Sequence, residues 1–107
     1  NSDTAGFALI KKDANKVEIV FDKEFEAAPV VNASVSFDEE KNDDGSPKET
    51  SELEQAFFAQ GYSYIIVNKS KKGFVIVLNK KAEDNISFTW TALRIKDAKT
   101  VQSRAPN

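Results

Sequence analysis

The segment Ile86-Ser-Phe-Thr-Trp-Thr-Ala-Leu93 decides the fold class of this 107-residue chain. Its apolar residues alternate with hydroxyl residues, so Ile86, Phe88, Trp90 and Ala92 share one face at a period of two. This alternation is typical of a β-strand with one buried and one polar face. We therefore predict a strand here, with the two aromatic side chains packed in the core rather than forming a platform for sugar rings.

Working outward from this strand, five further segments have strand-like composition and turn residues at their ends. They cover residues 6–11, 17–21, 29–37, 64–68 and 74–78. In the second of them we expect Val17, Ile19 and Phe21 to point inward. A short polar turn joins the first two segments, and we therefore predict that these two form a β-hairpin.

The segment 74–78 is apolar on both faces, unlike its neighbours. One face can pack on an opposite sheet, and the other needs a cover, either the helix described next or another subunit. Val75 and Val77 are therefore our candidates for an oligomer interface.

One insertion breaks the succession of strands. Residues 38–50 contain many acidic residues and no bulky apolar one, which predicts an exposed acidic loop. Residues 51–60 predict a short helix, with Ser51 and Glu54 as a capping box and Gly61 as the C-terminal stop. We expect one helical face to carry Leu53, Ala56 and Phe57.

The predicted fold is thus all-β: a single antiparallel β-sandwich of about six strands, with one short helix in the 51–60 insertion. A chain of this length fits one domain, 1–107. We expect residues 1–5 to be a linker end and residues 97–107 a polar tail. Because the chain does not begin with Met, we also expect it to be a segment of a longer protein.

The composition of the chain argues against several classes of function. Fifteen basic and seventeen acidic residues give a net charge of −2, which argues against nucleic acid as a partner. We find no apolar stretch of the length that a membrane-spanning helix needs, so we expect no membrane insertion. The chain has no His and no Cys, and therefore lacks the commonest general base and the commonest thiolate nucleophile. We expect no enzyme and no cofactor other than a weakly held calcium ion.

The calcium alternative comes from the acidic loop. Glu40, Asn42, Asp44 and Gly45 fall at the first, third, fifth and sixth positions of an EF-type loop. The match ends at the twelfth position, where Ser51 replaces the bidentate glutamate. Two interpretations stay open at this point: a solvated loop, or a weak divalent-cation site at Glu40, Asn42 and Asp44.

Two other groups are candidate contacts. Tyr62 and Tyr64 stand beside Gly61 at a strand entry, and they are our preferred aromatic contacts for a glycan. Five lysines occupy two consecutive turns, and we expect them to form a cluster that increases solubility. The alternative is that the cluster binds an anionic partner. These lysines are Lys69, Lys71, Lys72, Lys80 and Lys81.

The order of these features resembles the H-type lectin-like β-sandwich modules. The resemblance covers residues 16–95 and is carried by Val17-Glu-Ile-Val-Phe21, by Phe25 with Ala28-Pro-Val-Val31, by the run from Tyr64 to Gly73-Phe74, and by Phe88-Thr-Trp-Thr-Ala92. The family patterns are "F-x-x-x-P-x-V", "N-x-[ST]-x-x-G-F" and a terminal "W-x-A".

The resemblance implies a six-stranded antiparallel sandwich that assembles as a homotrimer. In the lectins, sugars of the N-acetylgalactosamine type bind in clefts between subunits, whereas similar modules in bacterial surface and phage fibre proteins serve as structural or receptor-binding heads. The lectins use a His and an Arg near the sugar. This chain has no His, and it offers Arg94 and Arg104, of which Arg94 is our candidate ligand contact.

We therefore expect a non-catalytic recognition or adhesion module of a larger extracellular or cell-surface protein, with a carbohydrate as its ligand class. The alternative is a purely structural trimerisation or capping domain of a fibre or surface protein.

Overall fold

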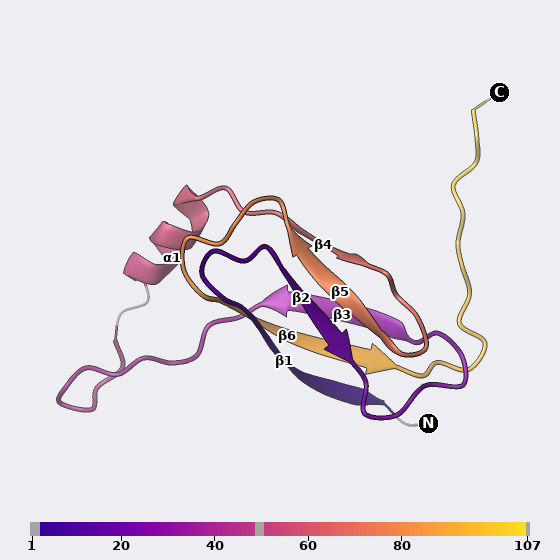
Figure 1. Cartoon of the computed structure of the whole chain (residues 1–107), viewed down its shortest axis with the longest axis horizontal. Coiled ribbons are helices and arrows are strands. Elements are labelled where there is room, and N and C mark those ends of the chain that lie inside the picture. Colours follow the sequence, from indigo (N-terminus) through magenta and orange to yellow (C-terminus); the bar gives the residue numbers. More distant parts are fainter. Residues whose placement is uncertain (1–2, 49–50, 107) are drawn as a thin grey trace.

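A computed structural model describes residues 3–48 and 51–106, apart from the side chains of Ser51 and Leu53. Six strands and one helix follow one another along the chain (Figure 1). They are β1 (Thr4–Ile10), β2 (Lys16–Val20), β3 (Val30–Val35), α1 (Ser51–Ala59), β4 (Tyr64–Val67), β5 (Gly73–Leu78) and β6 (Ile86–Leu93). The all-β class, with one short helix, is confirmed.

The strands form two three-stranded antiparallel sheets, in the orders β1-β6-β3 and β2-β5-β4. In Figure 1 the two sheets lie one above the other. The Ile86–Leu93 strand is central in its sheet, and every residue from Ile86 to Ala92 has a partner on β1. Its apolar residues Ile86, Phe88 and Ala92 are buried and its hydroxyl residues lie on the outer face, as the alternation predicts.

The predicted hairpin between the first two strands is wrong, because β1 and β2 belong to different sheets. The segment between them crosses from one sheet to the other instead of turning back. Its backbone bonds hold it to the turn that precedes β6: the N–H of Asp13 donates to the carbonyl of Ala82, and the N–H of Ala82 donates to the carbonyl of Ala14, each at 2.8 Å. The polar composition of this segment indicated a change of chain direction, but it did not indicate which strand β2 would pair with.

The inward side chains of the two sheets contact one another and form one core. The rings of Tyr64 on β4 and Phe88 on β6 lie 5.1 Å apart, and those of Phe74 on β5 and Trp90 on β6 lie 5.7 Å apart. Phe88 is 0% exposed and Trp90 is half-buried. The prediction that both aromatic residues of the last strand pack in the core is therefore confirmed.

The sizes of paired residues on β1 and β6 determine which face of β1 points inward. Gly6 is paired directly with Trp90, and a Cβ added at Gly6 would lie 2.8 Å from the indole ring. The large ring thus occupies the space that a side chain at Gly6 would need. Gly6 and Ala8 consequently face the core, while Phe7 between them faces solvent.

The helix α1 covers one end of the sheets. Phe57 packs against Phe37 and Tyr62, with ring centres 5.7 and 5.2 Å away. Gly61 has φ +64°, a left-handed conformation that suits glycine, and its N–H donates to the carbonyl of Phe58. The predicted stop at Gly61 is confirmed. The predicted capping box and the position of Leu53 depend on the side chains of Ser51 and Leu53, which lie outside the described atoms.

Two segments extend from this body. Residues 38–48 form an exposed hairpin-like loop closed by a bridge between Lys41 and Pro47. Residues 94–106 contain no helix or strand and run away from the sheets (Figure 1). In the part of the chain that the structure describes, no helix has the length and apolarity needed to cross a membrane.

Candidate functional site

The two tyrosines predicted to contact a glycan are engaged within the molecule. The Tyr62 hydroxyl accepts a hydrogen bond from the N–H of Glu83 at 2.7 Å, and the Lys80 ammonium lies 5.2 Å from the centre of the Tyr62 ring. Tyr64 packs its ring on Phe88 between the sheets. Both tyrosines are half-buried, so their contacts tie α1 and β4 to the body.

Arg94 is not brought together with the tyrosines. Its N–H donates to Asp3 at 2.8 Å, and its guanidinium pairs with Glu26 at 3.1 Å. Arg94 follows the C-terminal end of β6, whereas the Tyr62 hydroxyl bonds Glu83 ahead of the N-terminal end. The eight residues of β6 separate the two positions by about 27 Å at the usual rise of a strand.

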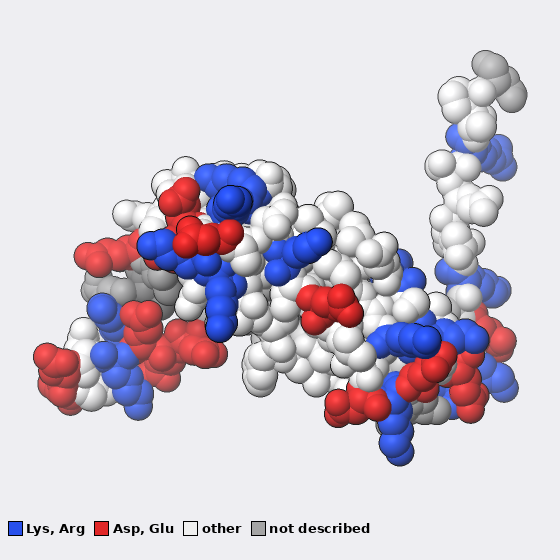
Figure 2. Space-filling view, in the orientation of Figure 1, with Lys and Arg blue, Asp and Glu red and all other residues white. Residues whose placement is uncertain are grey.

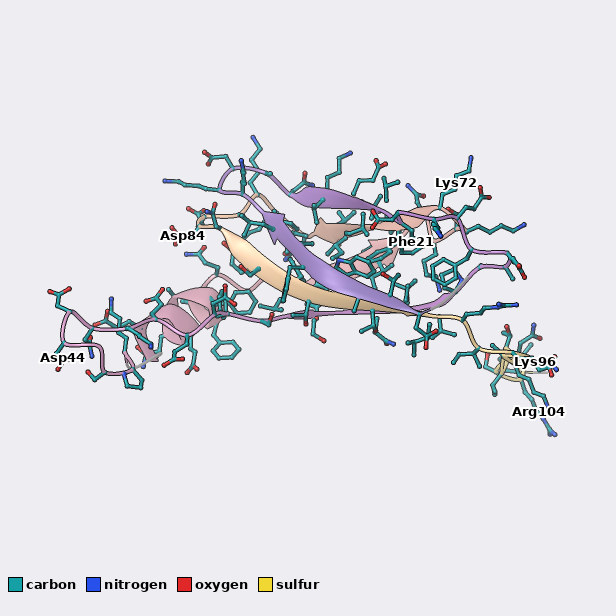
Figure 3. The ribbon with its side chains drawn as sticks, turned by 90° about the horizontal axis from the view of Figure 1, so that it is seen from below. Phe21, Asp44, Lys72, Asp84, Lys96 and Arg104 are labelled. Carbon is teal, nitrogen blue, oxygen red and sulfur yellow. The ribbon has the colours of Figure 1, made fainter. Side chains whose placement is uncertain are left out.

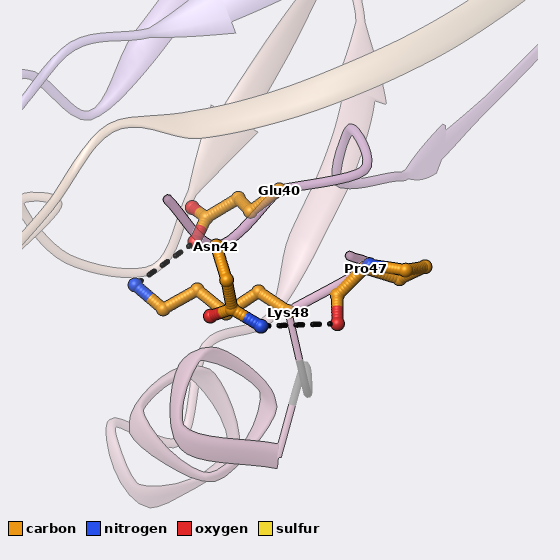
Figure 4. A network of polar contacts seen from close by, with 4 residues as sticks. All are labelled: Glu40, Asn42, Pro47 and Lys48. Atoms are coloured by element: carbon orange, nitrogen blue, oxygen red, sulfur yellow. Dashed lines mark hydrogen bonds and ion pairs between the residues drawn. The ribbon is translucent and has the colours of Figure 1, made fainter. Parts of the chain in front are cut away.

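The three residues of the predicted calcium site lie on the acidic hairpin, where each has a protein partner. Glu40 pairs with Lys48 at 3.8 Å, and the Asn42 amide donates to the Pro47 carbonyl at 3.4 Å (Figure 4). Asp44 lies at the tip of the hairpin (Figure 3) and accepts hydrogen bonds from the hydroxyl and the N–H of Ser46. Within residues 3–48 and 51–106, no group of three acidic side chains could hold a metal ion. Calcium binding stays a prediction.

The contact between Asp44 and Ser46 yields a pH prediction. The Ser46 hydroxyl and, after it, the Ser46 N–H lower the pKa of Asp44 below its ordinary value, because both bonds favour the carboxylate. Because the pKa of Asp44 is lower in the folded chain, the ionised carboxylate stabilises the turn at pH values above the pKa of the unfolded chain. This stabilisation is lost as the pH falls through the pKa of the folded chain. We expect Ser46→Ala to raise the pKa of Asp44, as measured by NMR titration of the carboxyl carbon. An unchanged midpoint would mean that the hydroxyl does not bond Asp44 in solution.

The predicted lysine cluster is not one cluster. Lys72 belongs to the turn before β5 and Lys80 to the turn after it, and consecutive turns of antiparallel strands lie at opposite ends of the strand between them. Figure 3 shows Lys72 near one end of the sheets and Asp84, in the turn that contains Lys80, near the other. Figure 2 likewise shows charged side chains gathered mainly at the two ends, with a largely uncharged middle.

A different surface is the outer face of the β1-β6-β3 sheet, which we call the Phe7 face. Phe7 is 85% exposed and stands in one row with Thr89 and Ser34, its successive partners across the sheet. The face is formed by Ala5, Phe7, Leu9, Val30, Asn32, Ser34, Ser87, Thr89, Thr91 and Leu93. None of these residues is charged.

A shallow hollow lies beside Phe7 on this face. Four polar residues rim it, and the paired residues Ala33 and Trp90 complete its lining. The rim residues are Asn32, Ser34, Thr89 and Thr91. The hydroxyl residues Thr89 and Thr91 lie on the strand next to that of Phe7, with about 4.8 Å between the strand backbones, whereas Asn32 and Ser34 lie one strand further away, on β3. The sequence did not predict this site, because the alternation in Gly6-Phe-Ala-Leu-Ile10 defines two faces of the strand without indicating which of them is exposed.

The outer face of the β2-β5-β4 sheet, which we call the valine face, is different in character. Val75 and Val77 lie at its centre, as the two-sided pattern of this strand predicts, and each is half-buried. Ile65 is 60% exposed and Val20 is 67% exposed at its margins. The face is formed by Lys16, Glu18, Val20, Ile65, Val67, Val75 and Val77.

Comparison with models of protein families found no family that matches the chain, and neither curated proteins nor solved structures gave a match. The resemblance to the H-type lectins therefore stays a prediction, and the function has to be argued from the two sheet faces.

Proposed function

We propose that this chain is a non-catalytic recognition module that binds carbohydrate on the Phe7 face. The observation that carries the proposal is Phe7 itself, an aromatic ring 85% exposed on an uncharged face. Phe7 does not stand alone, because Leu9 on the same face of β1 is 42% exposed, and a contiguous apolar patch of this kind marks interaction surfaces more often than single exposed residues do. The two facing sheets fit the six-stranded sandwich of a single such module.

The chemistry of the face suits a sugar. The apolar C–H face of a pyranose ring stacks on an aromatic ring, and its hydroxyls exchange hydrogen bonds with neutral side chains. Phe7 supplies the ring, and Thr89 and Ser34 supply hydroxyls in the same row. Because these groups are neutral, the face favours an uncharged saccharide over a phosphate or carboxylate ligand.

The alternative function is a purely structural assembly or capping domain. The valine face supports it, since half-buried valines at its centre and the exposed Ile65 and Val20 at its margins favour contact with another protein surface. For either function we propose an extracellular or cell-surface location within a longer protein, in line with the resemblance. The homotrimer implied by that resemblance stays a prediction.

A glycan array followed by calorimetry with the bound glycans tests the carbohydrate proposal. We expect Phe7→Ala to weaken binding about tenfold or more, since a central aromatic contact contributes about 2 kcal/mol. Phe58→Ala is the matched control, because Phe58 is also an exposed phenylalanine but lies on α1, and it should bind as the native chain does. Absence of glycan binding at millimolar concentration, or equal binding by Phe7→Ala, would overturn the proposal.

A further inference from the structure

We propose that the valine face joins two copies of this chain in a twofold dimer, in which Lys16 of each copy pairs with Glu18 of the other. This inference is independent of carbohydrate binding, because the Phe7 face belongs to the other sheet. It rests on the register of the three strands and on the charges that β2 places beside the valines.

The register arranges the valine face in two rows across the sheet. Lys16 is paired with Val77, which is paired with Ile65, and these form the first row. Glu18 is paired with Val75, which is paired with Val67, and these form the second. Each row therefore has one charged end, on β2, and two aliphatic residues, on β5 and β4. The two charged ends have opposite signs.

This arrangement is self-complementary under one symmetry operation. Consider two valine faces in contact, with a twofold axis between them that runs perpendicular to the strands at the level of Ile76, midway between the rows. The axis keeps each strand opposite its own copy and exchanges the two rows. Lys16 then lies opposite Glu18 of the second copy, and Val77 opposite its Val75. The same operation produces each contact twice, as in any isologous interface.

The local environment leaves both charges available for this pairing. Lys16 and Glu18 are exposed, and neither forms an ion pair within the residues that the structure describes. Their position at the edge strand makes them rim charges, which determine orientation and partner choice more than affinity. The valines and isoleucine supply the apolar contact. Since this patch is small against the roughly 800 Å² that each side of a standard interface contributes, the dimer should be weak and concentration-dependent.

The test uses the full chain in sedimentation equilibrium from about 10 μM to about 1 mM, a range that covers weak self-association. The native chain should follow a monomer–dimer equilibrium. Lys16→Glu places two acidic groups on the face and Glu18→Lys places two basic ones, so each variant alone should dimerise about tenfold more weakly or worse. The double swap, K16E with E18K, should restore the native dissociation constant to within about threefold.

A mixture of the two single variants is the sharpest measurement. Because each copy then meets only opposite charges, the mixture should form a heterodimer that neither variant forms alone. Circular dichroism establishes that each variant is folded, and Phe7→Ala, which alters the opposite sheet, should dimerise like the native chain. A strict monomer at about 1 mM, a trimer, or single variants that associate as the native chain does would overturn the proposal. Failure of the mixture to associate would also overturn it.

Discussion

Gly73→Ala is expected to lower the free energy of unfolding by about 4 kcal/mol or more. A loss of this size is a large part of the whole net stability of a small domain. Gly73 is paired with Val20 on the neighbouring strand, and a Cβ added at Gly73 would overlap the backbone oxygen of Ile19. Because the obstacle is backbone and not a flexible side chain, relief requires β2 to move away from β5. That movement breaks the ladder that holds Ile19 and Phe74 in the core.

Urea denaturation followed by circular dichroism measures this loss, and Gly45→Ala is the control. Gly45 has φ +87°, but no atom lies within 4 Å of a Cβ added there. Its replacement should therefore cost only the strain of a left-handed alanine, about 1 kcal/mol. If Gly73→Ala were no more destabilising than Gly45→Ala, the close approach of β2 to β5 would be wrong.

Phe88→Ala should destabilise the protein by about 3–5 kcal/mol, the range for removing a fully buried aromatic side chain. Phe88 is 0% exposed, lies on the central strand β6 and packs edge-to-face on Tyr64 with ring centres 5.1 Å apart. Truncation removes this contact and leaves a cavity between the two sheets. The same denaturation experiment measures the loss.

Phe58→Ala is the matched phenylalanine control, because Phe58 is 75% exposed on α1. Its replacement should change stability by no more than about 0.5 kcal/mol. A loss below about 1 kcal/mol for Phe88→Ala would contradict the shared core and, with it, the contact of β6 with the opposite sheet.

Much of the local structure could be predicted from the residues in order. The strands agree with the structure to within two residues at each end, although β1 begins at Thr4, inside the segment 1–5 expected to be a linker end. The inward residues of β2 and β6, the helix and its stop at Gly61 also agree with the structure. Each depends on neighbours along the chain: strand faces follow from the period of two, and the helix end follows from the freedom of glycine to adopt φ +64°.

The candidate sites were harder to predict because they depend on distant residues. Arg94 lies beyond one end of β6 and Tyr62 bonds Glu83 beyond the other, while the lysines of two consecutive turns are separated by the length of β5. The lysines are close in the sequence, but the extended strand between them converts that short separation into a large spatial distance. The hairpin prediction failed for a related reason, since strand partners are chosen by packing across the whole core.

The conformation of β1 depends both on its own sequence and on packing against distant residues. The sequence alone determined that residues 4–10 alternate between two faces, because alternation is a property of the extended backbone. It did not determine which face is buried, and the larger Phe7 and Leu9 would suit a core better than Gly6 and Ala8. The packing of the folded chain decides it, since Trp90 and Phe88, eighty or more residues away along the chain, lie opposite Gly6 and Ala8. That packing places Phe7 on the surface, where the proposed carbohydrate site lies.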